Sequence, residues 1–218
     1  MTHPHGIEAV VFDLGGVFTD SPFEALRAAG ADRGHSFEDS LHLVFGPYDD
    51  DTDHPWHRAE RGELDIEACR AEVRALGAER GIDLDLYDIL KYMSSDGGLR
   101  EVVVERARAL RLAGYRTALV TNNIAEFREW WRPMLPLDEL FDVVIDSSEV
   151  GIRKPDRRIY DLVLERLGGI PPERAVFLDD YPGNVAAAVA LGWHGIVVDA
   201  DPTSALEALD ALTTPTPS

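Results

Sequence analysis

The sequence predicts an α/β fold: a doubly wound, Rossmann-like parallel sheet of five strands with an all-helical cap inserted after its first strand. Short apolar runs rich in β-branched residues, such as residues 7–13, have the length and composition of buried strands. From about residue 99 onward, helical and strand patterns alternate, an order typical of parallel strands joined by right-handed crossovers. Between residues 22 and 96 the patterns are helical, without a convincing strand.

The elements of the core follow one another regularly along the chain. The five expected strands cover residues 7–13, 115–120, 141–145, 174–178 and 195–198. The expected core helices cover residues 99–114, 124–131, 155–167 and 182–191. Gly114 closes the first of these helices, as glycine often does at a helix C-terminus.

The inserted segment has helical patterns of its own. They cover residues 22–29, 37–45, 66–78 and 84–92, and the acidic run from Asp49 to Asp53 is expected to be a loop. We therefore expect a core formed by residues 1–17 and 97–213 and a cap formed by residues 18–96. The last five residues, 214–218, are polar and proline-rich, and we expect them to be disordered.

Composition limits the kinds of partner. Forty acidic residues face twenty-one basic ones, giving a formal net charge of −19, which repels nucleic acid and anionic membranes. No run of 18 apolar residues and no secretory signal pattern is present, and Cys69 is the single cysteine. These features predict a cytoplasmic protein without a membrane span. The sequence leaves a monomer and a homodimer equally open.

Polar and charged residues follow the expected strands at the points where the strands end. They are Asp13 after the first strand, Thr121 and Asn122 after the second, Lys154 in the loop after the third, and Asp179 and Asp180 after the fourth. The carboxyl ends of parallel strands share one edge of a sheet, where ligands bind in folds of this class. We therefore expect these side chains to form one site.

This set of side chains suits phosphoryl transfer. Three carboxylates at one edge repel one another, and a divalent cation that prefers oxygen ligands, Mg²⁺, relieves the repulsion. A lysine and a threonine hydroxyl suit the oxygens of a phosphate. Gly15 and Gly16 allow a backbone carbonyl to face the metal and N–H groups to face an anion. An aspartate can itself attack phosphorus and form an aspartyl-phosphate.

Four motifs at these strand ends resemble those of the haloacid dehalogenase-like (HAD) superfamily of phosphohydrolases. They are FDLGGV at residues 12–17, VTNN at 120–123, GIRKPD at 151–156 and FLDD at 177–180, the last accompanied by Asn184. The resemblance covers essentially the whole chain, and four motifs in this order are specific. The inserted segment resembles the small helical (C1) cap. Within it, HPWHRAERGE at residues 54–63 resembles the branch of soluble epoxide hydrolase N-terminal phosphatase domains and bacterial sugar-phosphate phosphatases.

The resemblance implies a role for each matching residue. Asp13 would be the nucleophile and a metal ligand, together with the Gly15 carbonyl, Asp179 and Asp180; Thr121, Asn122, Gly16 and Lys154 would hold the phosphate, with Thr121 and Lys154 taking part in catalysis. In the cap, His57 and Arg58 would contact the substrate. The implied reaction is Mg²⁺-dependent hydrolysis of a small phosphorylated metabolite.

One position departs from the family pattern. Phosphatases of this superfamily usually carry a second aspartate two residues after the nucleophile, where this chain has Gly15. That aspartate protonates the leaving oxygen and then activates water, and such general acid–base help contributes ~10²–10⁴-fold to the rate. The sequence therefore predicts slow turnover, a need for good leaving groups, or a substitute acid. The candidates, in decreasing order, are Asp20, His57 and Glu60.

Other functions fit part of the pattern. A 2-haloacid dehalogenase needs neither the second acid nor a metal, so Gly15 suits it, but the paired acids Asp179 and Asp180 do not. A phosphate-binding protein with weak or no turnover is a second alternative. A dinucleotide-dependent dehydrogenase is disfavoured because Gly15-Gly16 lacks the G-x-G-x-x-G spacing. Sugar phosphates, phosphoglycolate-like acids and nucleotides all remain open as substrates.

Overall fold

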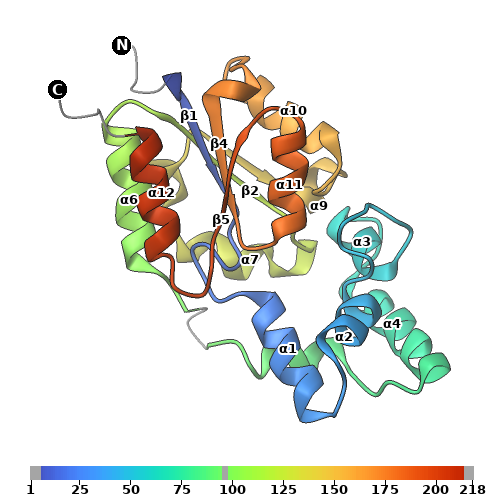
Figure 1. Cartoon of the computed structure of the whole chain (residues 1–218). Helices are drawn as coiled ribbons and strands as arrows, with labels where there is room; N and C mark the ends of the chain where they lie inside the picture. The colour runs from blue at the N-terminus through green and yellow to red at the C-terminus, as the bar shows by residue number, and fades with distance from the viewer. Residues whose placement is uncertain (1–5, 95–97, 214–218) are drawn as a thin grey trace.

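The computed structural model of the chain describes residues 6–94 and 98–213, and its core is one parallel sheet (Figure 1). The strands are β1 (Ala9–Phe12), β2 (Arg116–Thr121), β3 (Val143–Asp146), β4 (Ala175–Asp179) and β5 (His194–Val197). Their order is β3-β2-β1-β4-β5, and every neighbouring pair is parallel. The predicted fold class is confirmed. The tail expected to be disordered, residues 214–218, lies outside the described residues.

The first strand lies at the centre of the sheet and is fully buried. Val10 lies beside Thr117 of β2 and Val176 of β4. Because side chains alternate along a strand, Val10 and Phe12 pack into the apolar cluster on one face, and the intervening residues pack on the other. Burial on both faces explains why the strand is a continuous apolar run in the sequence.

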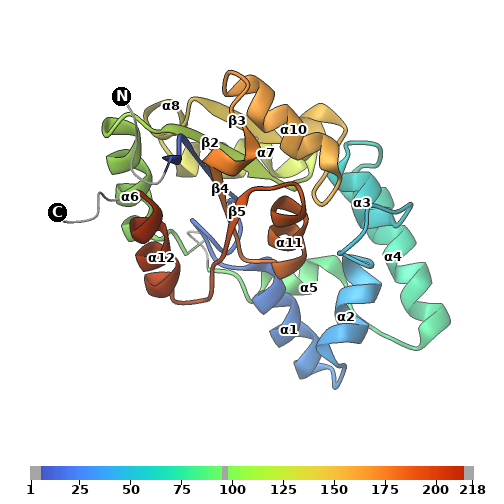
Figure 2. The same ribbon diagram turned by 45° about the horizontal axis from the view of Figure 1, so that its top comes forward.

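Helices cover both faces of the sheet (Figures 1 and 2). One face packs against α6 (Glu101–Leu112) and α12 (Thr203–Thr213), and the other against α10 (Arg157–Arg166) and α11 (Pro182–Ala190). Three further short helices are α7 (Arg128–Trp131), α8 (Leu137–Leu140) and α9 (Ser147–Val150). Among the described residues, no helix is both long and apolar enough to cross a lipid bilayer.

Several parts of the core differ from the predicted elements, and the short helices α8 and α9 had no predicted counterpart. The single helix expected over residues 124–131 is a 3₁₀ turn, Ala125–Phe127, followed by α7, and the chain then turns again around Pro133. The helix α12 was not predicted. Its apolar residues Ala205, Leu206 and Leu209 have helical spacing and pack into the core, a signal that could have revealed it.

The described residues between β1 and β2 contain helices and no strand. Besides α6, the helices are α1 (Pro22–Asp32), α2 (Phe37–Val44), α3 (Pro55–Glu60), α4 (Ile66–Arg80) and α5 (Leu86–Leu90). We call residues 22–90 the cap. Each cap helix begins at a residue whose side chain accepts a backbone N–H of the first turn; these are Ser21, Ser36, His54, Asp65 and Asp85.

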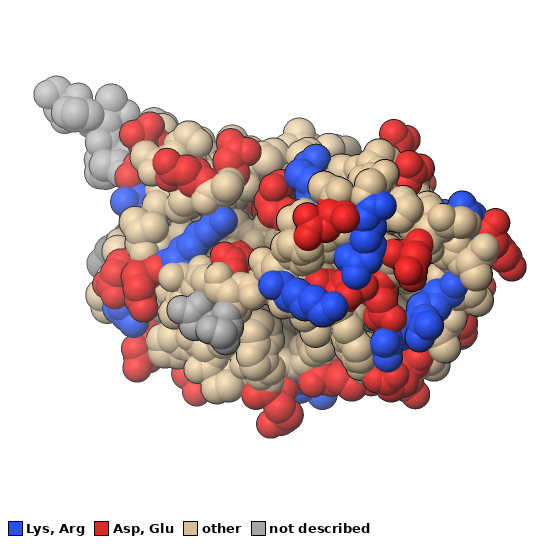
Figure 3. All heavy atoms as spheres, turned by 90° about the horizontal axis from the view of Figure 1, so that it is seen from below, with Lys and Arg blue, Asp and Glu red and all other residues tan. Residues whose placement is uncertain are grey.

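The cap has its own apolar cluster and lies at the edge of the sheet where β1 ends (Figure 1). It contacts the core closely where α3 lies beside α9. Gly62 has φ of 71°, and an added Cβ there would lie 2.5 Å from the carbonyl oxygen of Ser148. On the face shown in Figure 3, acidic and basic side chains lie intermixed, without an extended basic patch.

Candidate active site

The loop after β1 brings the backbone close to the acidic pair that follows β4. The backbone N–H of Asp13 donates to the carbonyl of Leu178 at 2.8 Å, which ties the ends of the two strands together. Gly16 has φ of 68°, and a Cβ on it would lie 2.0 Å from Oδ2 of Asp180. Glycine is required at position 16 for both reasons, since any side chain would collide with this carboxylate.

Lys154 lies between two carboxylates in the interior. Its Nζ is 2.8 Å from Oδ1 of Asp13 and 2.7 Å from Oδ2 of Asp179, and it also donates to the carbonyl of Val120 at 3.2 Å. Burial alone would lower the pKa of Lys154, but the two carboxylates hold it above its ordinary value. The lysine is therefore a fixed positive charge beside Asp13.

One lysine faces three acids at this site. Oxygen atoms of Asp13, Asp179 and Asp180 lie within 4.8 Å of one another. Burial raises the pKa of Asp13 to about 7, with Lys154 opposing the shift and Asp179 adding to it. Burial, Asp179 and Asp13 likewise raise the pKa of Asp180 well above its ordinary value. Clustered carboxylates with excess negative charge are the donor set that Mg²⁺ prefers, so these residues fit the ion.

Neighbouring groups hold the acids of this cluster in place. The side-chain amide of Asn184 donates to both carboxylate oxygens of Asp179, at 3.2 and 3.1 Å, and the N–H of Tyr181 donates to Oδ1 at 2.8 Å. The hydroxyl of Ser21 donates to Oδ2 of Asp180. Sequence reasoning did not single out Ser21, although a serine directly before Pro22 is a helix-start signal.

The two residues that end β2 have different surroundings. Asn122 holds the backbone of Lys154: its Oδ1 accepts from the Lys154 N–H at 2.8 Å, and its Nδ2 donates to the Lys154 carbonyl at 3.0 Å. It therefore positions the lysine. Thr121 is almost fully buried, and within the described part of the chain its hydroxyl makes one long hydrogen bond, 3.5 Å, to the Asn122 carbonyl. The Thr121 hydroxyl thus has capacity left for a ligand.

Two cap residues assigned to substrate binding from the sequence do not lie with the others. His57 is buried, and its Nδ1 accepts the backbone N–H of Thr52 at 3.0 Å. Arg58 forms ion pairs with Glu72 at 3.0 Å and Asp53 at 3.8 Å. Neither side chain lines the pocket described below. The structure gives His57 and Arg58 local roles in the cap.

Of the three candidate substitutes for the missing acid, Asp20 is the one that lines the pocket at the site, where its Oδ2 accepts the backbone N–H of Ser94 at 2.9 Å. A pocket of about 410 Å³ between cap and core is lined by Asp20 together with Gly15, Thr121 and Asn122. Glu60 instead accepts hydrogen bonds from Tyr48, Trp56 and Arg153. His57 uses its Nδ1 as described above.

The ion pair between Glu60 and Arg153 joins the cap to the core. The distance from Arg153 Nε to Glu60 Oε2 is 2.6 Å, and both side chains are essentially unexposed, at 0% and 1%. The Arg153 guanidinium also lies over the ring of Tyr48, 4.7 Å from its centre. A buried charge that loses its partner destabilises a fold strongly, so this pair fixes α3 against the loop that carries Lys154.

We expect Glu60→Gln to lower the free energy of unfolding by about 3–5 kcal/mol, because it removes the nearest counter-charge of the buried Arg153 and leaves Asp51 farther away, at 3.8 Å. Urea unfolding measures the change. In the double variant Glu60→Gln, Arg153→Met, most of the loss should be recovered because no charge remains buried. Equal losses in the single and double variants would contradict this account.

The burial of His57 predicts how the free energy of unfolding changes as the pH falls. Burial, helped by the charge of Arg153, lowers the pKa of His57 to about 3, whereas an ordinary histidine has a pKa near 6.5. As the pH falls below about 6.5, the unfolded chain takes up a proton that the folded chain refuses. The free energy of unfolding therefore decreases between about pH 6.5 and pH 3, by roughly 1–2 kcal/mol at pH 5 from this group.

We expect His57→Asn, whose Oδ1 can accept the Thr52 N–H, to lose less stability than the unsubstituted protein between pH 7 and pH 5. Urea unfolding at the two pH values gives the difference. The matched control is His194→Asn, at an exposed position of β5, which should keep the original pH dependence. An unchanged pH dependence in His57→Asn would show that the histidine is protonated in the folded protein.

The family described as haloacid dehalogenase-like hydrolase matches residues 7–192. Mouse acyl-CoA dehydrogenase family member 10 is 34% identical over 97% of this chain, and rat bifunctional epoxide hydrolase 2 is 32% identical over 67% of it. This chain spans only 20% and 27% of the lengths of those two proteins.

A third relative is similar over most of its length. Sesquiterpene phosphatase astK of Aspergillus oryzae is 28% identical over 87% of this chain and 88% of its own. Among solved structures, a HAD-like hydrolase of Porphyromonas gingivalis has a TM-score of 0.62 and 24% identity, covering 93% of this chain and 97% of its own. A Bacteroides thetaiotaomicron enzyme, solved with magnesium and inorganic phosphate, has a TM-score of 0.57 and 21% identity over 90% of this chain and 96% of its own.

Proposed function

Because the chain belongs to the haloacid dehalogenase-like hydrolase family, we propose that it hydrolyses phosphate monoesters with the help of Mg²⁺ and of an aspartyl-phosphate formed on Asp13. The observation that carries the proposal is the buried cluster in which Lys154 contacts Asp13 and Asp179, with Asp180 beside them. Relatives named as phosphatases, and a structural neighbour solved with magnesium and phosphate, support it.

Each residue of the cluster would have a definite task. A carboxylate oxygen of Asp13 attacks phosphorus, and the bond from phosphorus to the ester oxygen breaks, so that the alcohol leaves and takes up a proton from solvent water. Water then attacks the aspartyl-phosphate, breaks the bond between phosphorus and the Asp13 oxygen, and releases inorganic phosphate. Lys154 holds a positive charge next to the attacking carboxylate, and Thr121 offers its hydroxyl to a phosphoryl oxygen.

Mg²⁺ would be held by Asp13, Asp180 and the carbonyl of Gly15, with Asp179 beside it. When bound, it would neutralise charge on the phosphoryl oxygens and on the acids. The neighbouring carbonyl of Gly16 accepts a hydrogen bond from Arg100, which supports the choice of the Gly15 carbonyl as the metal ligand of this loop. Asn184 and Ser21 would keep the two acids after β4 oriented toward the ion.

Dehalogenation of 2-haloacids is the weaker alternative. Such a substrate carries a carboxylate, which needs a cationic or hydrogen-bonding partner outside the reacting centre. Among the described residues that line the pocket there is no lysine or arginine, and the one charged side chain is Asp20. Because that reaction uses no metal, a carboxylate-bearing substrate would also meet the excess negative charge of Asp13, Asp179 and Asp180 without a cation to neutralise it.

The test is release of inorganic phosphate from p-nitrophenyl phosphate, measured with Mg²⁺ and again after removal of divalent ions by EDTA. This substrate has a good leaving group and so depends little on the acid that Gly15 lacks. We expect release with Mg²⁺, a loss of at least about 100-fold with EDTA, and recovery when Mg²⁺ is added back. Equal rates with and without EDTA would refute metal-dependent hydrolysis.

A further inference from the structure

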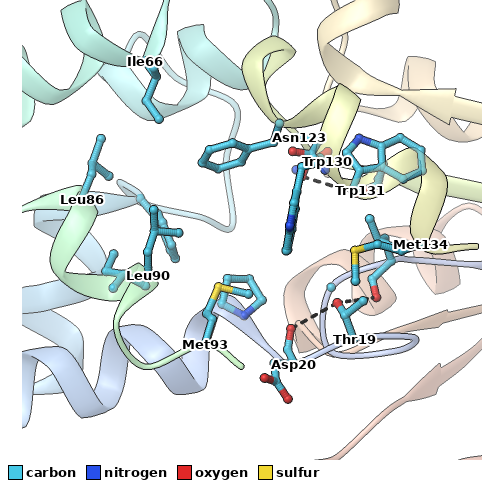
Figure 4. A pocket seen from close by; sticks show the side chains of 18 of the residues that line it. Thr19, Asp20, Ile66, Leu86, Leu90, Met93, Asn123, Trp130, Trp131 and Met134 are labelled. Atoms are coloured by element: carbon cyan, nitrogen blue, oxygen red, sulfur yellow. Dashed lines mark hydrogen bonds between the residues drawn. The ribbon is translucent and has the colours of Figure 1, made fainter. Parts of the chain in front are cut away.

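The pocket at the active site is lined largely by apolar side chains. Ile66, Leu86 and Leu90 come from the cap, Met93 follows α5, and Trp130 and Met134 come from the core. Figure 4 shows the cap residues on one side and the core residues facing them across an open space, with Thr19 and Asp20 at the lower edge. The volume of the pocket, about 410 Å³, is within the range of pockets that enclose a ligand of tens of atoms.

The apolar walls lead directly to the reacting end of the site. The same pocket is lined by Gly15, Thr121 and Asn122, which follow the ends of β1 and β2. A phosphate held beside Asp13 would therefore have its organic group directed along the apolar walls. The pocket is polar at one end and apolar along the rest of its walls. This distribution of polarity matches a monophosphate whose organic group is apolar.

Two large apolar side chains of this pocket remain exposed in the protein alone. Trp130 is 49% exposed and Leu90 is 45% exposed, and they belong to the few large hydrophobic side chains with substantial exposure among the described residues. Trp130 lies in the wall of this pocket. Apolar surface left open next to a reacting centre points to an apolar ligand.

We propose that the substrate is the monophosphate of a long apolar alcohol, such as a fatty alkyl or isoprenoid phosphate, whose chain lies between α5 and the segment around Trp130. The proposal rests on the phosphatase function proposed above and names its substrate class. A sugar phosphate fits less well, because its hydroxyl groups would lose water along the walls formed by Leu86, Leu90 and Met134 without gaining hydrogen-bond partners there.

The first experiment measures kcat/KM for a series of n-alkyl phosphates from butyl to decyl, with glucose 6-phosphate and p-nitrophenyl phosphate alongside. The alcohols of the series are equally poor leaving groups, so differences in kcat/KM report the contribution of the alkyl chain. Each methylene moved from water into apolar surroundings should add about fourfold. We expect decyl phosphate to exceed butyl phosphate by at least about 100-fold, and to exceed glucose 6-phosphate as well.

A second readout does not depend on turnover. Calorimetry compares the binding of n-decylphosphonate and methylphosphonate in the presence of Mg²⁺, and we expect the decyl compound to bind at least about 100-fold more tightly. Leu90→Gln, which makes one pocket wall polar, should lower this preference about fivefold or more. Leu112→Gln is the control, since Leu112 is 83% exposed in α6 and does not line the pocket; it should keep the preference.

The outcomes separate the substrate class from the function. If p-nitrophenyl phosphate is hydrolysed but neither kcat/KM nor phosphonate binding rises with chain length, the substrate class is wrong while the phosphatase function stands. If no ester is hydrolysed but n-decylphosphonate still binds in preference, the apolar pocket is supported and the phosphatase function fails. If Leu90→Gln and Leu112→Gln change the preference equally, the chain does not lie where we place it.

Discussion

Replacement of Asp13 by Asn is expected to lower kcat for phosphate release by at least ~10⁴-fold. The amide is a poor nucleophile and cannot form the aspartyl-phosphate. The substitution should leave the fold intact, because Lys154 keeps its 2.7 Å contact with Asp179 and its hydrogen bond to the Val120 carbonyl. The measurement is steady-state phosphate release from p-nitrophenyl phosphate with saturating Mg²⁺, together with thermal unfolding of the variant.

A matched substitution separates the role of Asp13 from a general effect of lost charge. Asp161 lies on the surface in α10, where it pairs with Arg157 at 2.9 Å, and Asp161→Asn should keep the full rate. If Asp13→Asn retains more than about one hundredth of the activity while folded, Asp13 is not the nucleophile. Water would then have to attack phosphorus directly in this protein.

Gly15→Asp should raise the rate for esters with poor leaving groups by ~10²–10⁴-fold, because it supplies the acid that related phosphatases usually carry at this position. The site has room for the side chain on one side, since Gly15 lines the pocket. A Cβ there would lie 3.2 Å from Cδ of Pro22, so the start of α1 must give slightly. The measurement is kcat/KM across esters whose alcohols differ in pKa.

The dependence on the leaving group is the diagnostic feature. Without an acid, kcat/KM should fall steeply as the pKa of the alcohol rises; with Asp at position 15, the decline should become shallow. The Asn side chain of Gly15→Asn has the same size as Asp but cannot act as an acid. In this variant the decline of kcat/KM should remain as steep as in the original chain. If the original chain already shows a shallow decline, another group supplies the proton, and Asp20→Asn should then make the decline steep.

Much of the fold could be predicted because the information is local. A run such as AVVF in β1 is apolar at every position because the strand is covered on both faces, and that pattern is visible without the structure. The ends of parallel strands meet at one edge whatever the loops do, so Asp13, Lys154 and Asp179 could be placed together before any coordinates. The comparisons confirm the family that these motifs indicated.

Contacts between distant segments could not be predicted. Nothing near Glu60 in the sequence shows that its partner is Arg153, 93 residues away, or that this pair removes Glu60 from the candidate acids. The exposed-helix pattern around His57 likewise gave no sign that its Nδ1 accepts from Thr52 and that the ring is buried. Both residues had been weighed as substitutes for the missing acid, and only their surroundings rule them out.

The sequence by itself therefore determined the sheet and most of the helices that cover it, and it predicted which side chains meet at the edge of the sheet, because strand composition and strand-end residues are read from short stretches of chain. Only the tertiary structure decided what the organic part of a substrate meets. Trp130 and Leu90 line one pocket because α5 of the cap packs opposite the segment that follows β2. Packing between the cap and the core depends on the distances between their elements. The spacing of apolar residues along a single element carries no information about those distances.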